Sequence, residues 1–185
     1  MEIMKYLNLL KFKKRILKPR PIDKEHSFSQ GEVLVSKTDL TGKITYANKN
    51  FISVAGYSQN QLLGKPHNIT RHPKMPRLIF KKLWTELQAG REINAFVLNL
   101  AKDGGYYWVF ANVTPSFDTQ NHIIGYHSTR RRPNRKGLDI IKPLYDLLRK
   151  HEVIGGIDAS ELLLEEFLEK KGVKYDEFLF TIQHS

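Results

Sequence analysis

The stretch KITYANKNFISVAGYS, residues 43–58, decides the fold. Its first five residues include β-branched and aromatic side chains, as is typical of a β-strand. From Asn48 the pattern becomes helical, because Phe51 and Ala55 lie four residues apart and Gly56 is placed to end a helix. We therefore predict a strand that passes through Asn48 directly into a short helix.

The sequence on either side of this stretch predicts one more strand, a shaped loop and a longer helix. Residues 32–36 form a strand-like run, and the polar residues after them favour a tight turn into the strand at 43–47. Residues 65–76 contain three prolines and cannot form one regular helix. Residues 77–89 have the apolar spacing of an amphipathic helix, which Gly90 would end.

Three further strands complete the predicted core. They are expected at residues 93–100, 106–114 and 123–129, with polar turns between them. The order is thus two strands, then helices, then three strands. Since each apolar face of a sheet must be covered, we predict an α+β fold with a five-stranded antiparallel sheet and the helices on one face.

The C-terminal part of the chain is predicted to be helical. The expected helices are residues 138–150, 158–171 and 174–182. The glycine pair Gly155–Gly156 predicts a hinge between the first two. The apolar faces of these helices could either pack back on the sheet or offer a surface to a partner helix.

Composition limits what the protein can be. The 185 residues suffice for one sizeable hydrophobic core with appendages. No stretch approaches the roughly 20 apolar residues that a membrane-spanning helix needs, so we expect a soluble, cytoplasmic protein. The chain has no cysteine, which excludes disulfides and thiolate metal sites. We expect no metal site, because histidines and carboxylates are not clustered in the sequence.

The net charge of +11 is unevenly distributed. Much of the excess lies in residues 11–24 and 130–136, which we interpret as flanks rather than as a binding groove. These flanks lack interleaved aromatic residues and a helix-turn-helix signature, so nucleic-acid binding is not expected. Phosphate-binding motifs of kinases are missing as well, and an enzyme is not expected.

Several motifs carry a resemblance to a known family. They are Ile44-Thr-Tyr-Ala-Asn48, Gly56-Tyr57, Gly64-Lys-Pro-His-Asn68, Arg71-His-Pro73 and Tyr107-Trp-Val109. Together they resemble the FAD-holding PAS domain of bacterial aerotaxis receptors. The Ala-Asn and Gly-Tyr pairs are shared by most PAS domains, whereas Pro-His-Asn and Arg-His-Pro are specific to this group.

The resemblance implies a PAS fold, an FAD cofactor, and a sensing role without catalysis. It divides the chain into a basic amphipathic N-terminal cap at residues 1–26, a PAS sensor domain at 27–133 and a C-terminal helical extension at 134–185. One departure is Lys74, because the family often has an acidic residue after Arg-His-Pro. By position, the implied flavin-binding residues are Asn48, Arg71, His72, Trp84 and Asn99.

Each of these five residues also has an interpretation without a ligand. Asn48 could simply cap its helix, and His72 could brace its loop. Trp84 could be a core residue, and Arg71 could be an exposed charge on a polar loop. Asn99 interrupts an apolar strand, so it either faces the core and needs a partner or points to solvent. In the flavin interpretation, reduction of the ring changes the charge near Arg71 and Asn99.

Other cofactors remain as alternatives. The lack of cysteine excludes the flavin–cysteine photoadduct of blue-light PAS domains. Haem is a rival, since His67, His72, His122 or His127 could be an axial ligand. A cofactor-free PAS domain that serves only as a dimerisation or scaffold module is the second alternative.

The resemblance also predicts partners. Aerotaxis receptors continue into membrane anchors and a signalling coiled coil that this sequence does not contain. We therefore expect the soluble half of a bipartite energy-taxis system, with a membrane-bound chemotaxis signalling protein as its partner. A homodimer and a peripheral membrane contact through the basic N-terminus are further options.

Overall fold

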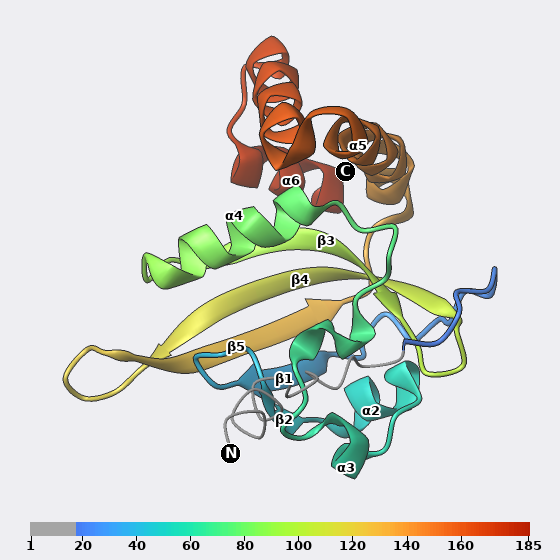
Figure 1. Cartoon of the computed structure of the whole chain (residues 1–185), viewed down its shortest axis with the longest axis vertical. Helices are drawn as coiled ribbons and strands as arrows, with labels where there is room; N and C mark the ends of the chain where they lie inside the picture. Colours follow the sequence, from blue (N-terminus) through green and yellow to red (C-terminus); the bar gives the residue numbers. More distant parts are fainter. Residues whose placement is uncertain (1–17) are drawn as a thin grey trace, which may run out of the picture.

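The computed structural model describes residues 18–185, which contain one five-stranded antiparallel sheet with the order β2-β1-β5-β4-β3 (Figure 1). The strands are β1 (Leu34–Thr38), β2 (Ile44–Ala47), β3 (Ile93–Leu100), β4 (Tyr106–Phe117) and β5 (Ile123–Arg131). The prediction of an α+β fold with such a sheet is confirmed. Strand β4 continues through Pro115 because, beyond Val113, β4 pairs only with β5, and proline is tolerated in such an edge segment.

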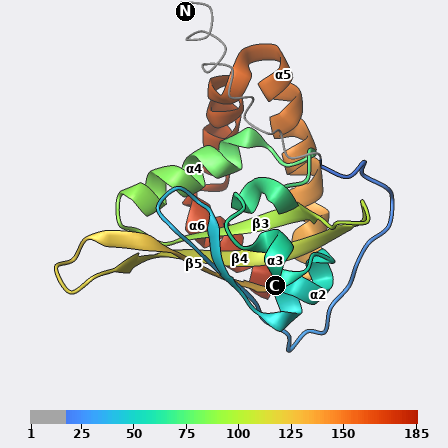
Figure 2. The ribbon, with the colours of Figure 1, turned by 60° about the horizontal axis from the view of Figure 1, so that its bottom comes forward.

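One face of the sheet is covered by the short helices and by α4. These elements are α2 (Lys49–Ala55), α3 (Gln59–Leu62), the 3₁₀-helix η1 (His67–Thr70) and α4 (Arg77–Gln88). Helix α2 begins as predicted, because Asn48 accepts a hydrogen bond from the Phe51 N–H, and it ends at Gly56 with φ of 70°. Figure 2 shows α4 and the short helices grouped around the same side of the sheet.

The C-terminal helices are α5 (Arg135–Lys171) and α6 (Tyr175–His184). Helix α6 packs on the opposite face of the sheet at β3, and Tyr145 of α5 contacts Phe96 and Trp108 on that face, while α5 also packs against α4 and α6. The side chains of Leu138, Ile141 and Leu148 in α5 are buried. The predicted hinge lies inside α5, where Gly155 and Gly156 have non-helical dihedral angles and separate two helical parts. Of the two alternatives for these helices, their buried residues therefore pack back on the domain.

The N-terminal cap predicted at residues 1–26 lies mostly outside the described residues. Its last part runs along the turn between β3 and β4, where the Ile22 N–H donates to the Gly104 carbonyl and the His26 N–H donates to the Tyr106 carbonyl. Within residues 18–185, no helix is both long and apolar enough to cross a membrane.

Candidate functional site

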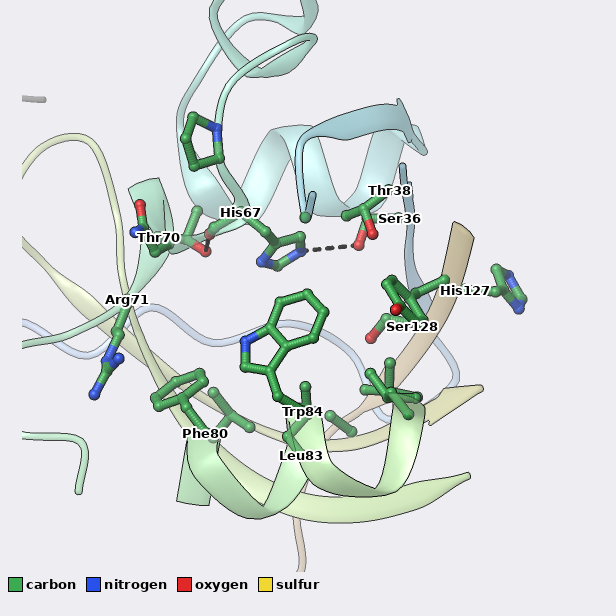
Figure 3. Close-up of a pocket in the computed structure, with 18 of the residues that line it drawn as sticks. Ser36, Thr38, His67, Thr70, Arg71, Phe80, Leu83, Trp84, His127 and Ser128 are labelled. Atoms are coloured by element: carbon green, nitrogen blue, oxygen red, sulfur yellow. Dashed lines mark hydrogen bonds between the residues drawn. The ribbon is translucent and has the colours of Figure 1, made fainter. Parts of the chain in front are cut away.

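A cavity of about 480 Å³ lies between the sheet and the elements that cover its first face (Figure 3). This volume falls within the roughly 300–1,000 Å³ of small-molecule sites in proteins. Its lining residues come from β1, η1, α4 and the three strands β3, β4 and β5, and from the loops at residues 41–42, 66 and 71. Successive side chains of a strand point to opposite faces of the sheet. In β3, Val97 and Asn99 therefore face the cavity, while Phe96 and Leu98 face α5 and α6.

The wall formed by α4 is apolar and aromatic. Its side chains Phe80, Leu83 and Trp84 face the cavity (Figure 3). The Trp84 ring packs edge-on against Tyr126, with 5.3 Å between the ring centroids. Gly42 also lies beside the indole, and a Cβ atom there would come within 3.2 Å of the ring. The glycine thus lets the β1–β2 turn approach Trp84, and the wall suits a flat aromatic ligand.

Asn99 is the clearest sign that a ligand belongs in this cavity. Its side chain is only 4% exposed, and its Nδ2 donor has no hydrogen-bond partner within the described part of the chain. Its Oδ1 accepts only a long 3.5 Å hydrogen bond from the Thr70 hydroxyl. A buried amide without a partner costs about 1–3 kcal/mol. A ligand with an acceptor atom near Asn99 would remove that cost.

Arg71 lies at the edge of the cavity rather than at its centre. A backbone bridge to Asn99 ties its segment to β3. Its guanidinium stacks over the Phe80 ring at 3.9 Å and, in Figure 3, points away from Trp84. Burial lowers the pKa of Arg71, and the carboxylate of Glu152 opposes that shift. The half-buried guanidinium can donate to an anionic group near the cavity entrance.

His72 and Asn48 do not line the cavity. His72 follows Arg71 in the chain and is buried on the side of Tyr106, where its Nδ1 accepts a 3.1 Å hydrogen bond from the Lys74 N–H. Burial, and then the charge of Lys74, lowers the pKa of His72 to about 4. Asn48 uses its amide to hold the backbone of β1 and α2, with bonds of 2.8–3.0 Å. Of the five predicted residues, Arg71, Trp84 and Asn99 therefore line the cavity.

A polar cluster of Ser36, His67 and Arg130 at the cavity wall was not predicted as a site. The Ser36 hydroxyl lies 2.9 Å from His67 Nε2, and Arg130 donates to that hydroxyl at 2.7 Å. The interpretation of Arg130 as part of a flank was wrong, since the side chain is 2% exposed. Its position two residues after cavity-lining Ser128 in β5 is the signal that could have revealed it.

The histidines considered for haem are poorly placed as axial ligands. His67 lines the cavity, but its Nε2 already contacts Ser36 and Arg130. The ring of His127 points away from Trp84 in Figure 3, and His122 lies on the β4–β5 turn. Within residues 18–185, no three side chains of the metal-binding types come together.

A five-stranded antiparallel sheet whose helices enclose a ligand-sized cavity defines an α+β domain suited to hold a small molecule. The family described as PAS fold matches residues 32–130, which is more than half of the chain. The chain therefore belongs to the PAS family, as the sequence motifs predict.

The chain also resembles individual proteins of known name. The Escherichia coli (strain K12) aerotaxis receptor is 41% identical over 115 residues, which cover 62% of this chain and 22% of the receptor. The nitrogen fixation regulatory protein of Klebsiella pneumoniae is 30% identical over 142 residues, covering 74% and 28% of the two chains. This chain therefore spans less than a third of either relative.

A solved structure shows the same fold. The dark structure of the blue-light photoreceptor Aureochrome1 LOV has a TM-score of 0.54 and 22% sequence identity, covering 62% of this chain and 85% of that chain.

Proposed function

We propose that this protein is an FAD-binding PAS sensor of redox or energy state that signals to a membrane-bound chemotaxis receptor without catalysing a reaction. The buried, unpartnered Asn99 amide in a cavity with an aromatic wall is the observation that carries the proposal. The aerotaxis-type motifs and the identity to the aerotaxis receptor support the choice of FAD.

The residues around the cavity fit the chemical parts of a flavin. The flat tricyclic ring needs apolar walls, which Phe80, Leu83 and Trp84 supply. The polar edge of the ring carries oxygen and nitrogen acceptors, and Asn99 Nδ2 is a free donor for one of them. Arg71 at the cavity edge suits the phosphate groups. When bound, the flavin would supply reversible electron uptake, which the side chains of this chain lack.

The two predicted residues outside the cavity have supporting roles in this proposal. Asn48 fixes the junction of β1 and α2, and His72 fixes the segment that carries Arg71. We therefore propose Trp84, Asn99 and Arg71 as flavin contacts, with Asn48 and His72 as residues that shape the site.

A link from the cavity wall to the C-terminal helices provides a route for the signal. The carboxylate of Glu152 in α5 accepts a 2.8 Å hydrogen bond from the Leu78 N–H, in the first turn of α4. Helix α4 also carries Trp84, and Glu152 lies just before the kink at Gly155. A ligand that moves Trp84 would therefore move α4, whose N-terminal turn is hydrogen-bonded to Glu152 of α5.

We propose that a partner binds the exposed surface of α5 on both sides of this kink, together with α6. Several large apolar side chains of α5 and α6 are exposed there, namely Val153, Ile154, Leu162 and Phe180. Their exposure supports contact with a chemotaxis protein or a second copy of the chain. A cytoplasmic location, with a peripheral membrane contact through the basic N-terminus, belongs to the same proposal. Nucleic acid is not part of it.

A titration of purified, ligand-free protein with FAD tests the proposal. We expect quenching of tryptophan fluorescence by FAD and weaker binding by Asn99→Ala. The matched control is Asn112→Ala, because Asn112 pairs with Asn94 on the opposite face of the sheet and should bind FAD normally. Failure of the unchanged protein to bind FAD would refute the proposal and leave the scaffold alternative. Preferential uptake of haem would also refute it.

A further inference from the structure

Arg130 is a buried cation without an anionic partner in the described part of the chain. Its guanidinium donates to the Ser36 hydroxyl at 2.7 Å and lies 3.4 Å from His67 Nε2, while its Nε donor has no partner. The face of the Phe51 ring lies 4.2 Å from the guanidinium carbon. None of the ion pairs within residues 18–185 includes Arg130.

This arrangement leaves a positive charge uncompensated in the interior. Burial lowers the pKa of Arg130 to about 10, so the side chain stays charged at neutral pH. The nearby Tyr107 hydroxyl is also buried without a partner, and burial raises its pKa, so it supplies no negative charge. Removing a charge from water costs several kcal/mol when no counter-ion is present. An anionic or electron-rich ligand group would offset this cost.

The charge lies directly behind the cavity wall. Ser36 and His67 line the cavity, and Arg130 holds both from behind. Because Arg130 can only donate, the Ser36 oxygen and His67 Nε2 act as acceptors toward it. Burial and the charge of Arg130 lower the pKa of His67 to about 3, which keeps the ring neutral. The neutral ring then carries its proton on Nδ1.

We propose that Arg130, with Ser36 and His67, forms an electropositive wall that binds the electron-rich edge of the ligand ring and stabilises the ring when it becomes negatively charged. The inference rests on the proposed flavin function and assigns the charge-sensing role to Arg130 instead of Arg71. A bound flavin reduced by two electrons from a chemical reductant and one proton from water would carry one more negative charge. A fixed cation beside the ring favours that form.

The position of Arg130 favours an interaction with the edge of the flavin ring over one with the phosphates. Arg130 is 2% exposed and lies behind the inner wall, whereas Arg71 is half-buried at the cavity edge. The phosphates of FAD are strongly hydrated and belong near solvent, close to Arg71. The ring is the part of the ligand that the apolar wall of the cavity can hold.

The test compares the midpoint potential of bound FAD in three variants, measured by dithionite titration with a reference dye. In Arg130→Met, the affinity for reduced relative to oxidised flavin should fall at least tenfold, which lowers a two-electron midpoint potential by about 30 mV. Arg130→Lys retains the charge and should restore most of the potential. Arg131→Met removes a neighbouring exposed charge and is the matched control, with no change expected.

A second arm separates the ring from the phosphates. The dissociation constants of FAD, FMN and riboflavin should rise by the same factor in Arg130→Met. If FAD and FMN weaken but riboflavin does not, Arg130 serves the phosphates and the inference is wrong.

The outcomes also separate this inference from the proposed function. An unchanged potential in Arg130→Met that still binds FAD would overturn the electropositive wall and leave the flavin sensor intact. Absence of FAD binding in the unchanged protein would refute the proposed function itself. If Arg130→Met does not fold, Ser36→Ala provides the measurement, because it breaks the link between Arg130 and the cavity, and an unchanged potential there would contradict the inference.

Discussion

The two faces of the sheet use alternate residues of the same strands, but they differ in packing and in polar pairing. On the face under α5 and α6, the Phe96 and Phe110 rings pack 5.0 Å apart, and the Tyr145 hydroxyl donates to the Phe96 carbonyl at 2.9 Å. On the other face, Asn99 has an unpartnered donor beside a cavity of about 480 Å³. The first face stabilises the fold, and the second is available for a ligand.

Neighbouring residues therefore have separable roles. Leu98 lies on the side of Tyr145, where both residues border a second hollow, and the next residue, Asn99, faces the cavity. Substitutions on the packed face should change the free energy of unfolding, while substitutions on the cavity face should change ligand affinity.

The largest contrast should come from the two tryptophans. Trp108 is 7% exposed and packs against Tyr145, so Trp108→Ala should lower the free energy of unfolding by about 3–5 kcal/mol. Trp84→Ala should cost about 1–2 kcal/mol, since Trp84 borders the cavity, but should weaken FAD binding at least tenfold. Urea unfolding and FAD titration measure the two quantities, and Trp108→Phe serves where the alanine variant does not fold. Equal effects of both substitutions on FAD affinity would contradict the separation.

The pH dependence of stability should reflect the two buried histidines. The pKa values of His67 and His72 are lowered to about 3 and about 4, below the ordinary value of 6.5. Below pH 6.5 the unfolded chain therefore binds more protons than the native protein, and stability falls as the pH drops from about 6.5 to 4. The loss per histidine should be of the order of 1–3 kcal/mol. His67→Asn and His72→Asn should each flatten the curve measured by urea unfolding, and an unaltered slope in both would show that the histidines are not buried as described.

The smallest contrast should come from two turn glycines. Gly42 and Gly64 have φ of 77° and 71°, so alanine at either position should cost about 1–2 kcal/mol of stability. Only at Gly42 would the new Cβ atom contact Trp84, whereas nothing lies within 4 Å at Gly64. We expect Gly42→Ala to weaken FAD binding several-fold and Gly64→Ala to leave it unchanged. A similar affinity in both variants would show that Trp84 does not position the ligand.

Local patterns were sufficient to predict most of the fold. The strand and helix within residues 43–58, the kink at Gly155–Gly156 and the five-stranded sheet all depend on short-range spacing or on turn residues, and the structure contains each of them. Asn99 could be identified as a candidate from the sequence, because a polar residue in an apolar strand needs a partner. Whether its side chain faces the cavity or solvent could be decided only from the register of β3 in the sheet.

The parts of the site that were missed depend on longer-range pairing. Strand β5 was predicted to end at Thr129, but pairing with Ala111 and Phe110 in β4 extends it to Arg131. This extension turns Arg130 inward, although three consecutive arginines suggested an exposed flank. The segment after η1 is similarly decided by its bridge between Arg71 and Asn99, which directs His72 away from the cavity.

The most direct test of the central claim is the visible absorption spectrum of the purified protein, followed by acid release and identification of the chromophore. We expect the paired bands of an oxidised flavin and the release of FAD. A colourless protein that also fails to take up added FAD would contradict this expectation, and a Soret band would show that the cavity face holds haem instead.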